Sequence, residues 1–515
     1  MKSIAEIAKI LTSLGIRRSR IFPRGARNSN DTFYERFFDG VVSGEFSDDD
    51  DAANSLYGSN AGDVRFTTLK SRLREVLLTA LMNIEPRQYE LGELMQVTLQ
   101  CKKNLVCARL LLVFGARSTG MDLIKRSMRK AEKYHLTELA LECALMTQRQ
   151  SAVTGHRPSF QKAAKTVRLH LDNLNAETQA ETLWSELAIE FARSRSYKSD
   201  ILEKARKHTA RIGVLRDRHN TRSLNQTYFR MQILQSQIAR DYSRTLEYCD
   251  RINEYYREHP HFSNLARRRE IAIIKLNGYT FLRDFENGRA LAQRALEELF
   301  SGREPGWYNI NELHFLLCMH TGNYTLAAEI FVTVTNSKRF EYTTAQTHER
   351  WRILEAFLRY VLSHTGAEAP PEKATTFERR FNVYKFLNEV PIFNRDKSGF
   401  YVPILIVHIL FQLEQGDFLS ILDRAETLRQ YSSRYLRKAG YARTNTFLKM
   451  LKIMIDQDFD PELTRAKTAK HLERLADRSA DFDPVLEVTE VIPYEVLWSM
   501  VMKRLQELRT SEGVS

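Results

Sequence analysis

The feature that most constrains the fold of this chain is a 3.6-residue spacing of apolar side chains, which recurs along almost its whole length. In MDLIKRSMRKAEKYHLTELALEC, one apolar stripe covers residues 123–131 and a second begins at 139, after the short YHLT segment. Proline and glycine, which interrupt helices, number only 12 and 21 in 515 residues, and runs with strand-like alternation are short. The sequence therefore predicts an all-α protein built from helix–turn–helix units.

A second spacing recurs where such units join. In HTGNYTLAAEIF, Gly322 precedes Tyr324 by two residues, which suits a tight turn that opens a helix. Ala327 and Phe331 follow at helical spacing. Weaker versions of this motif begin at three other aromatic residues: Tyr242, Phe285 and Phe418. A small residue lets two helices approach closely, while the ring fills the space between neighbouring pairs, so stacked helix pairs are predicted.

The intervals between these motifs give the chain a resemblance to tetratricopeptide repeats. Tyr242 and Phe285 are 43 residues apart (285 − 242), and Phe285 and Tyr324 are 39 apart (324 − 285). A regular tetratricopeptide repeat has about 34 residues, so the units here are longer and irregular. The chain resembles a tetratricopeptide-like array over roughly 101–362 and again from 400 onward. The resemblance implies a right-handed α-solenoid whose inner helices line a concave groove.

A second resemblance rests on three segments, KSRLREVLL, NRDKSGFYVPILIVHILFQLEQGDFLSILDRAETLRQYSSRYLRK and VIPYEVLWSMVMKRL. Together they look like a family of uncharacterised bacterial cytosolic helical-repeat proteins. This resemblance implies a bacterial origin and a helical-repeat architecture, but it implies no activity. Five scattered cysteines in apolar helical patterns predict buried, reduced thiols and a cytoplasmic location. No targeting segment is visible, and the longest apolar stretch, VPILIVHILFQL, is too short to span a bilayer and predicts a buried helix.

Breaks in the helical pattern predict the domain organisation. Residues 1–90 form an N-terminal helical module that contains the acidic segment GEFSDDDDAANSLYGSNAGD, read as a loop around one short helix. Residues 91–362 form the tetratricopeptide-like repeats. The stretch SHTGAEAPPEKATT, residues 363–376, has two prolines and no periodicity and is predicted to be a linker. Residues 377–515 form C-terminal repeats and a capping helix that begins near Pro493.

The repeat frame predicts which polar residues face the groove. Counting back from the motif aromatics places six on the inner helices: Arg230, Gln237, Asn277, Asn309, Glu312 and His320. Arg230 and Asn277 suit a carboxylate or a peptide backbone. A frame shift of one residue would turn all six to other faces, and the sequence leaves both readings open. The leading prediction is a non-catalytic protein–protein interaction scaffold or adaptor that binds a peptide or partner helix.

The basic charge of the chain raises a second hypothesis, a DNA-binding transcriptional regulator. The formal net charge is +13, and residues 191–275 carry roughly twice as many basic as acidic residues. Near the N-terminus, a helix bearing Lys70, Arg72 and Arg74 follows a glycine-containing turn, which is similar to the helix-turn-helix half of bacterial winged-helix regulators. The repeats would then act as a sensor. Against this, the turn is long and no wing hairpin follows, so a plain helical cap for the solenoid is the favoured interpretation of the module. A generally basic, well-solvated helical surface is likewise the favoured explanation of the charge.

Motifs for catalysis, metals and cofactors fail at specific positions. GARSTGMD has Met121 where a phosphate loop needs lysine. In HFLLCMH, His314, Cys318 and His320 cannot converge on one helical face, so Cys318 is expected in the core. DQDFDPE places Pro461 where a calcium loop requires glycine, and Asp460 is read instead as a helix cap. We predict no cofactor or metal and no enzyme activity, although a catalytic site of dispersed residues would leave no trace in sequence.

Overall fold

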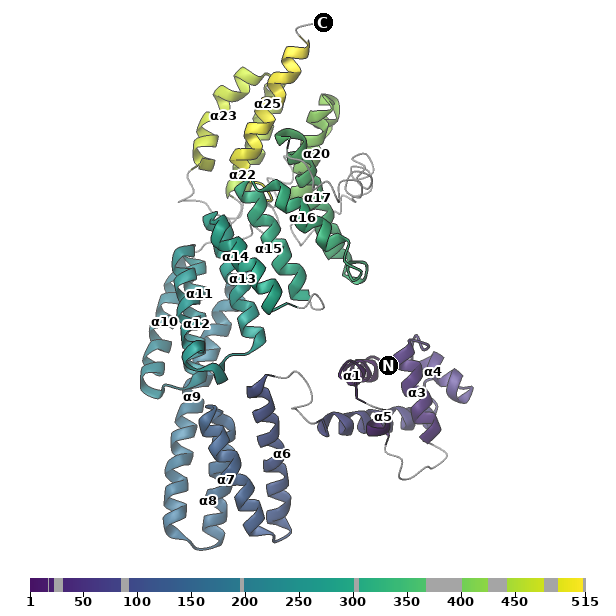
Figure 1. Ribbon diagram of the computed structural model, residues 1–515, viewed down its shortest axis with the longest axis vertical. Helices are drawn as coiled ribbons and strands as arrows, with labels where there is room; N and C mark the ends of the chain where they lie inside the picture. The colour runs from purple at the N-terminus through teal and green to yellow at the C-terminus, as the bar shows by residue number, and fades with distance from the viewer. Residues whose placement is uncertain are drawn as a thin grey trace. The chain divides into compact units, whose positions relative to one another are not determined.

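The computed structural model describes residues 1–16, 18–22, 31–84, 92–194, 199–300, 305–366, 401–424, 442–476 and 490–512. Within these residues every regular element is a helix, which confirms the all-α prediction (Figure 1). None of the described helices is both long enough and apolar enough to cross a membrane. The chain divides into two compact units, Met1–Lys130 and Ala131–Ser515, whereas the sequence predicts that the first module ends at 90.

The first unit holds the helices α1 (Lys2–Ser13), α2 (Arg18–Ile21), α3 (Asp31–Ser43), α4 (Asp49–Tyr57), α5 (Val64–Met82), α6 (Glu93–Val113) and most of α7 (Arg117–Lys133). Its main core lies between α1, α3, α4 and α5, where Phe37, Phe66 and Leu73 are fully buried. The short helix predicted inside the acidic segment is α4. The Asp48 side chain caps it by accepting a hydrogen bond from the Asp51 amide at 2.9 Å.

The second unit continues with α8 (Thr137–Val153), α9 (Arg157–Ser194), α10 (Ser199–His219), α11 (Arg222–Ile238), α12 (Tyr242–Glu258), the short η2 (Pro260–Phe262), α13 (Leu265–Leu282), α14 (Phe285–Glu298), α15 (Pro305–Thr321), α16 (Tyr324–Thr335), η3 (Phe340–Tyr342), α17 (Ala345–Thr365), α20 (Tyr401–Glu414), α22 (Ala442–Asp456), α23 (Pro461–Ala476) and α25 (Tyr494–Glu512). Helices that follow one another pack in pairs, among them α11 with α12, α13 with α14 and α15 with α16. We call α9, α11, α13, α15 and α17 the first helices. At 38 residues, α9 is far longer than a tetratricopeptide helix.

The aromatic motifs mark the start of the second helix in each pair. Three second helices begin at the predicted residues: Tyr242, Phe285 and Tyr324. Two positions earlier the backbone is left-handed each time, with φ of 59° at Arg240, 54° at Arg283 and 79° at Gly322. Glycine adopts this conformation without strain and arginine does so less readily, which explains why the glycine of the motif is visible in only one of the three.

The small residue of the motif is required by close packing. At Gly288 in α14, an added Cβ would lie 2.5 Å from Leu317 Cδ2 and 3.1 Å from Tyr279 Cβ. These two side chains come from α15 and α13, so α14 lies close to both neighbours at this point. The next small residue in the motif, Ala292, is fully buried. Helix pairs therefore approach through small residues, as the sequence predicts.

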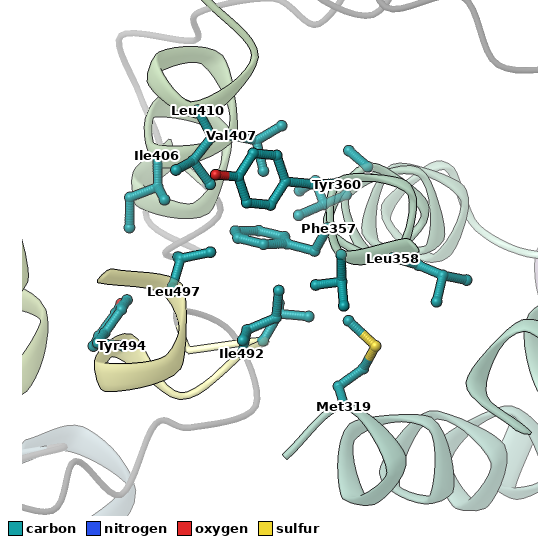
Figure 2. Packing of buried hydrophobic residues seen from close by; sticks show 14 of the residues in the cluster. Met319, Phe357, Leu358, Tyr360, Ile406, Val407, Leu410, Ile492, Tyr494 and Leu497 are labelled. Carbon is teal, nitrogen blue, oxygen red and sulfur yellow. The ribbon is translucent and has the colours of Figure 1, made fainter. Parts of the chain in front are cut away.

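The C-terminal helices share one core with the helices that precede the predicted linker. Figure 2 shows Phe357 and Tyr360 of α17 beside Ile406 and Leu410 of α20 and Leu497 of α25. The predicted linker therefore does not separate two cores. Its first three residues belong to α17, and residues 367–376 lie outside the described residues.

Three local predictions for the C-terminal part are confirmed. The apolar stretch from 402 forms the buried helix α20, and every residue from 402 to 413 is buried. The capping helix is α25, which begins one residue after Pro493 and buries Leu497, Val501 and Leu505. Asp460 caps α23 by accepting a hydrogen bond from the Leu463 amide at 2.8 Å.

Candidate functional site

All six residues predicted to face a groove lie on first helices. Arg230 and Gln237 are on α11, Asn277 is on α13, and the rest are on α15. Their exposure differs. Asn309 is exposed, four are partly buried, and one, His320, is buried. Because their exposure differs, the side chains have to be placed one at a time.

His320 cannot contact a partner, and this corrects its prediction as a groove residue. Its side chain is 6% exposed, and its Nε2–H donates to the backbone carbonyl of Glu490 at 2.8 Å. Burial lowers the pKa of the imidazole, which keeps it neutral. His320 instead ties α15 to the segment that leads into α25.

Two of the predicted residues form ion pairs between successive first helices. Arg230 of α11 lies 3.2 Å from Glu181 of α9, and Glu312 of α15 pairs with Arg350 of α17. These pairs connect neighbouring units across the stack. Spacing along a single helix cannot reveal such contacts, since each partner is 38 or more residues away in sequence.

Arg230 also belongs to a cluster of polar side chains, several of whose buried donor atoms lack a hydrogen-bond partner. Its guanidinium lies over the ring of Trp184 of α9, 3.4 Å from the ring centre, in a cation–π contact. The Nε atom of Arg230 and the Nε1 atom of Trp184 are both buried and lack a hydrogen-bond partner. Buried donors without acceptors are rare in proteins and cost stability.

Arg222, the first residue of α11, belongs to the same cluster. One of its terminal nitrogens donates to Gln226 Oε1 at 3.2 Å, while its Nε atom is buried and unpartnered. Burial lowers the pKa of the guanidinium, which means that its charged form is penalised. The main opposing charge is Glu177 of α9, which itself accepts a hydrogen bond from the Thr137 hydroxyl at 2.7 Å.

Tyr256 of α12 completes the cluster. Its side chain is 6% exposed, and its hydroxyl has no hydrogen-bond partner. Burial raises the pKa of this hydroxyl, and the nearby charges of Arg222, Arg230 and Arg267 act in the opposite direction. Arg267 of α13 is in turn paired with Glu270 at 2.6 Å. We refer to Arg222, Arg230, Tyr256 and Arg267 as the arginine–tyrosine cluster.

A group of aromatic side chains is connected to this cluster through Gln226, which accepts a hydrogen bond from Arg222. Tyr255 lies 4.7 Å from the ring of His259 and 6.0 Å from the ring of Phe262, measured between ring centres. The ring centre of His135 lies 5.1 Å from that of Phe262, and Gln226 donates to the Phe262 carbonyl at 3.1 Å. The cluster therefore combines cationic donors with flat apolar surfaces, a combination common at protein-binding hot spots.

Two of the predicted residues follow Arg230 of the cluster and Glu270, the partner of Arg267, along the first helices. Gln237 follows Arg230 by seven residues on α11, and Asn277 follows Glu270 by seven on α13. Seven residues are about two helical turns, so each pair shares a helix face. The sequence analysis names Arg230, Gln237 and Asn277 in this region but does not name Arg222, Tyr256 or Arg267. The surplus of basic residues over 191–275 is the one sequence signal that pointed to this region.

A separate cavity of about 290 Å³ lies between α16, η3 and α17. Its lining combines apolar rings with charged side chains: Phe331, Phe340, Trp351, Arg352, Glu355 and Arg359. Glu355 and Arg359 pair with each other at 2.8 Å. The cavity could take one apolar side chain, but it offers no set of unpartnered polar groups comparable to the arginine–tyrosine cluster.

The residues of the DNA-binding hypothesis lie on α5 and are differently engaged. Lys70 is partly buried, and its Nζ lies 2.6 Å from Asp49 of α4. Burial alone would lower the pKa of Lys70, but the bond to Asp49 raises it, so the ammonium is already paired with an anion. Arg72 and Arg74 are exposed. Two cations, not three, are therefore directed to solvent.

A buried ion-pair network in the C-terminal part has a structural role. Arg443 of α22 is 3% exposed and pairs with Glu490, which is 4% exposed, at 2.7 Å and with Glu495 of α25 at 2.7 Å. Arg283, in the turn before α14, pairs with Glu495 at 2.6 Å. The two arginines and the two glutamates of the network carry equal and opposite charge, so the network is neutral without a bound ligand.

Comparison with known proteins gives no family for this chain. No protein-family model, curated protein or solved structure matches it. Among the residues that the structure describes, no group of three histidine, cysteine, aspartate or glutamate side chains is arranged to hold a metal ion.

Proposed function

We propose that this chain is a non-catalytic scaffold or adaptor that binds a peptide or partner helix on the face formed by the first helices α9, α11 and α13. The observation that carries the proposal is a set of three buried donor atoms without acceptors: Arg222 Nε, Arg230 Nε and the Tyr256 hydroxyl. A bound chain could supply acceptors to these groups through its carbonyl and carboxylate oxygens. A right-handed solenoid with a concave groove, in a bacterial cytoplasm, remains part of this proposal.

The aromatic and cationic character of the face supports a protein ligand. Trp184, Arg230 and Tyr256 are of the residue types that contribute most to binding energy at protein interfaces. The successive first helices also give a surface longer than one helix, which suits an extended or helical segment.

Affinity capture at physiological salt with matched variants tests the proposal. The bait is the full chain, and the recovered material is analysed for protein and nucleic acid. We expect a stoichiometric protein partner that is lost in the Arg230→Ala, Asn277→Ala double variant and retained in Arg251→Ala. Arg251 is exposed on α12, a second helix, and pairs only locally with Glu247. A partner retained by the double variant would exclude this face as the binding surface.

Recovery of DNA without a protein partner would favour the regulator hypothesis instead. The variants for that outcome are Arg72→Glu and Arg74→Glu, because both side chains are exposed. Lys70→Glu is a poorer choice because it would place a second carboxylate beside Asp49 and destabilise the α4–α5 contact. DNA binding through these residues should weaken steeply as salt is raised.

A further inference from the structure

The end of the hairpin formed by α8 and α9 carries basic residues and no acidic ones. No aspartate or glutamate occurs between Glu142 and Asp172, although 64 of the 515 residues are acidic. α8 and α9 pack against each other and are joined by a short turn at residues 154–156 (Figure 1). Five basic residues lie in this interval: Arg149, Arg157, Lys162, Lys165 and Arg168. The hairpin end therefore has positive charge without a carboxylate of its own to balance it.

These five cations are accessible to a partner. All five side chains are exposed, and none forms an ion pair or a side-chain hydrogen bond with a residue that the structure describes. The arginines of α12 differ, because Arg244, Arg251 and Arg257 each lie within 3.3 Å of a carboxylate. Like charges gathered without counter-charges repel one another and attract anions from solution.

Four of the cations form a row along the outer side of α9. Arg157 and Arg168 are eleven residues apart (168 − 157), about three helical turns, so they share a face of the helix. Lys162 and Lys165 lie next to that face, and the buried Ala163 is on the opposite side. From Arg157 to Arg168 the row extends about 16 Å along the helix axis.

The length of the row indicates a polyanion. A single carboxylate or phosphate group would contact only part of a row of this length. A nucleic acid presents phosphates in succession, and duplex DNA carries one negative charge per about 1.7 Å of its axis. The absence of carboxylates between residues 142 and 172 means that no acidic residue within this stretch repels the successive phosphates.

The apolar side chains of the same stretch argue against an anionic membrane as the polyanion. A helix that lies on a membrane buries one continuous apolar face. Phe160, Leu169 and Leu171 are exposed, but Leu169 lies on the opposite side of α9 from the other two, because nine residues are two and a half helical turns. The exposed part of α9 thus has no single apolar face to insert.

We propose that the end of the α8–α9 hairpin binds the phosphate backbone of a nucleic acid through its exposed arginines and lysines. Contacts to phosphates alone carry no information about base sequence, so the binding is independent of sequence. The inference goes beyond the proposed function and does not depend on it. Arg168 precedes Glu181, on the face of the first helices, by 13 residues (181 − 168), or about 20 Å along α9.

The test is titration of fluorescent duplexes, one of DNA and one of RNA with the same sequence, with the full chain at several salt concentrations. The variant is Lys165→Gln with Arg168→Gln. We expect it to weaken binding at least about tenfold and to reduce the slope of log affinity against log salt by roughly 1.8, because each phosphate contact contributes about 0.9. Arg157→Gln with Lys162→Gln should have the same effect. All these side chains are exposed, so the variants should keep the wild-type melting temperature.

The matched control is Arg251→Gln with Arg257→Gln, which removes the same two charges from α12. It should bind as the wild type does. Equal weakening in the control and in the hairpin variants would show that net charge alone attracts the duplex, and would overturn the proposal. Loss of binding in Arg72→Gln with Arg74→Gln alone would assign the nucleic acid to α5 and would also overturn it.

The two duplexes and two further probes distinguish the sources of negative charge. Preference for DNA or for RNA assigns the nucleic acid and supports the surface in either case, whereas binding of neither duplex at low salt overturns it. Vesicles rich in phosphatidylserine test for a membrane, and hexaglutamate peptide tests for an acidic protein. Binding of the vesicles but of neither duplex, or displacement of the duplex by hexaglutamate at equal charge concentration, would contradict the assignment to nucleic acid.

Discussion

Single residues show how polar groups in this protein divide between stability and binding. Arg443 is deeply buried, yet its guanidinium donates to two carboxylates and to the Leu475 carbonyl. Burial alone would lower its pKa, but Glu490 and Glu495 raise it, so the charged form is retained. Arg222 is the opposite case, because it is partly buried and its Nε donor has no acceptor. The two arginines therefore differ in how completely their buried donor atoms are paired.

Removing Arg443 should be strongly destabilising. Arg443→Leu leaves the carboxylate of Glu490 buried without its counter-charge, and we expect the free energy of unfolding to fall by about 3–5 kcal/mol. Chemical denaturation of the variant and the wild type measures this loss. The matched control is Arg465→Leu, whose side chain is exposed and pairs with the exposed Glu462, and it should change stability by less than about 1 kcal/mol. Equal effects in the two variants would contradict the structural role of the network.

His364 should make stability depend on pH. Its Nε2 lies 2.9 Å from Glu414 of α20, and this contact raises the pKa of the imidazole, while its burial opposes the rise. The negative charge of Glu507 also favours the imidazolium form of His364. The Nδ1–H of His364 donates to the Tyr360 carbonyl. Arg504 forms an ion pair with the same Glu414 carboxylate.

A raised folded-state pKa means that this stabilisation is complete below the unfolded value near 6.5. It is lost as pH rises through the folded value. His364→Gln should therefore cost roughly 1–3 kcal/mol at pH 6 and progressively less toward pH 9. Denaturation at several pH values measures this difference, and a cost that grows with pH would contradict the assignment.

At the scale of helices, close approach between pairs depends on the small residue of each motif. Gly288→Ala should lower the free energy of unfolding by about 1–3 kcal/mol, because the new Cβ would meet Leu317 and Tyr279 in a packed core. Gly62→Ala is the control, since its Cβ would meet only the Asn60 side chain, at 3.2 Å. Thermal or chemical denaturation of both variants decides the matter, and no loss in Gly288→Ala would show that the α13–α14–α15 packing is looser than described.

The helices also show which features can be predicted from sequence. The starts of α12, α14 and α16 were predicted because a turn followed by a packed face is a local signal. Cys107 shows the limit of such signals. It lies in an apolar pattern and was expected to be buried, but it is exposed on α6, as are Val106 and Leu110. A helix with apolar residues on more than one side does not reveal which side packs.

At the scale of the whole molecule, the features that sequence could not predict depend on contacts between distant segments. The arginine–tyrosine cluster joins residues of α11, α12 and α13, and no spacing along one helix brings them together. The shared core of α17, α20 and α25 likewise joins helices on both sides of the predicted linker. Periodicity predicts elements and their pairing, whereas the site and the domain boundaries follow from how the pairs pack.

The central claim is that a protein partner binds on the face of the first helices α9, α11 and α13, and site-specific photo-crosslinking tests it most directly. A photoreactive residue is placed at Asn277 on α13 or at Arg251 on α12, and the crosslinked products from native extract are identified by mass spectrometry. The account predicts that one protein crosslinks from position 277 and not from 251. Crosslinking of that protein from 251 alone would contradict the account.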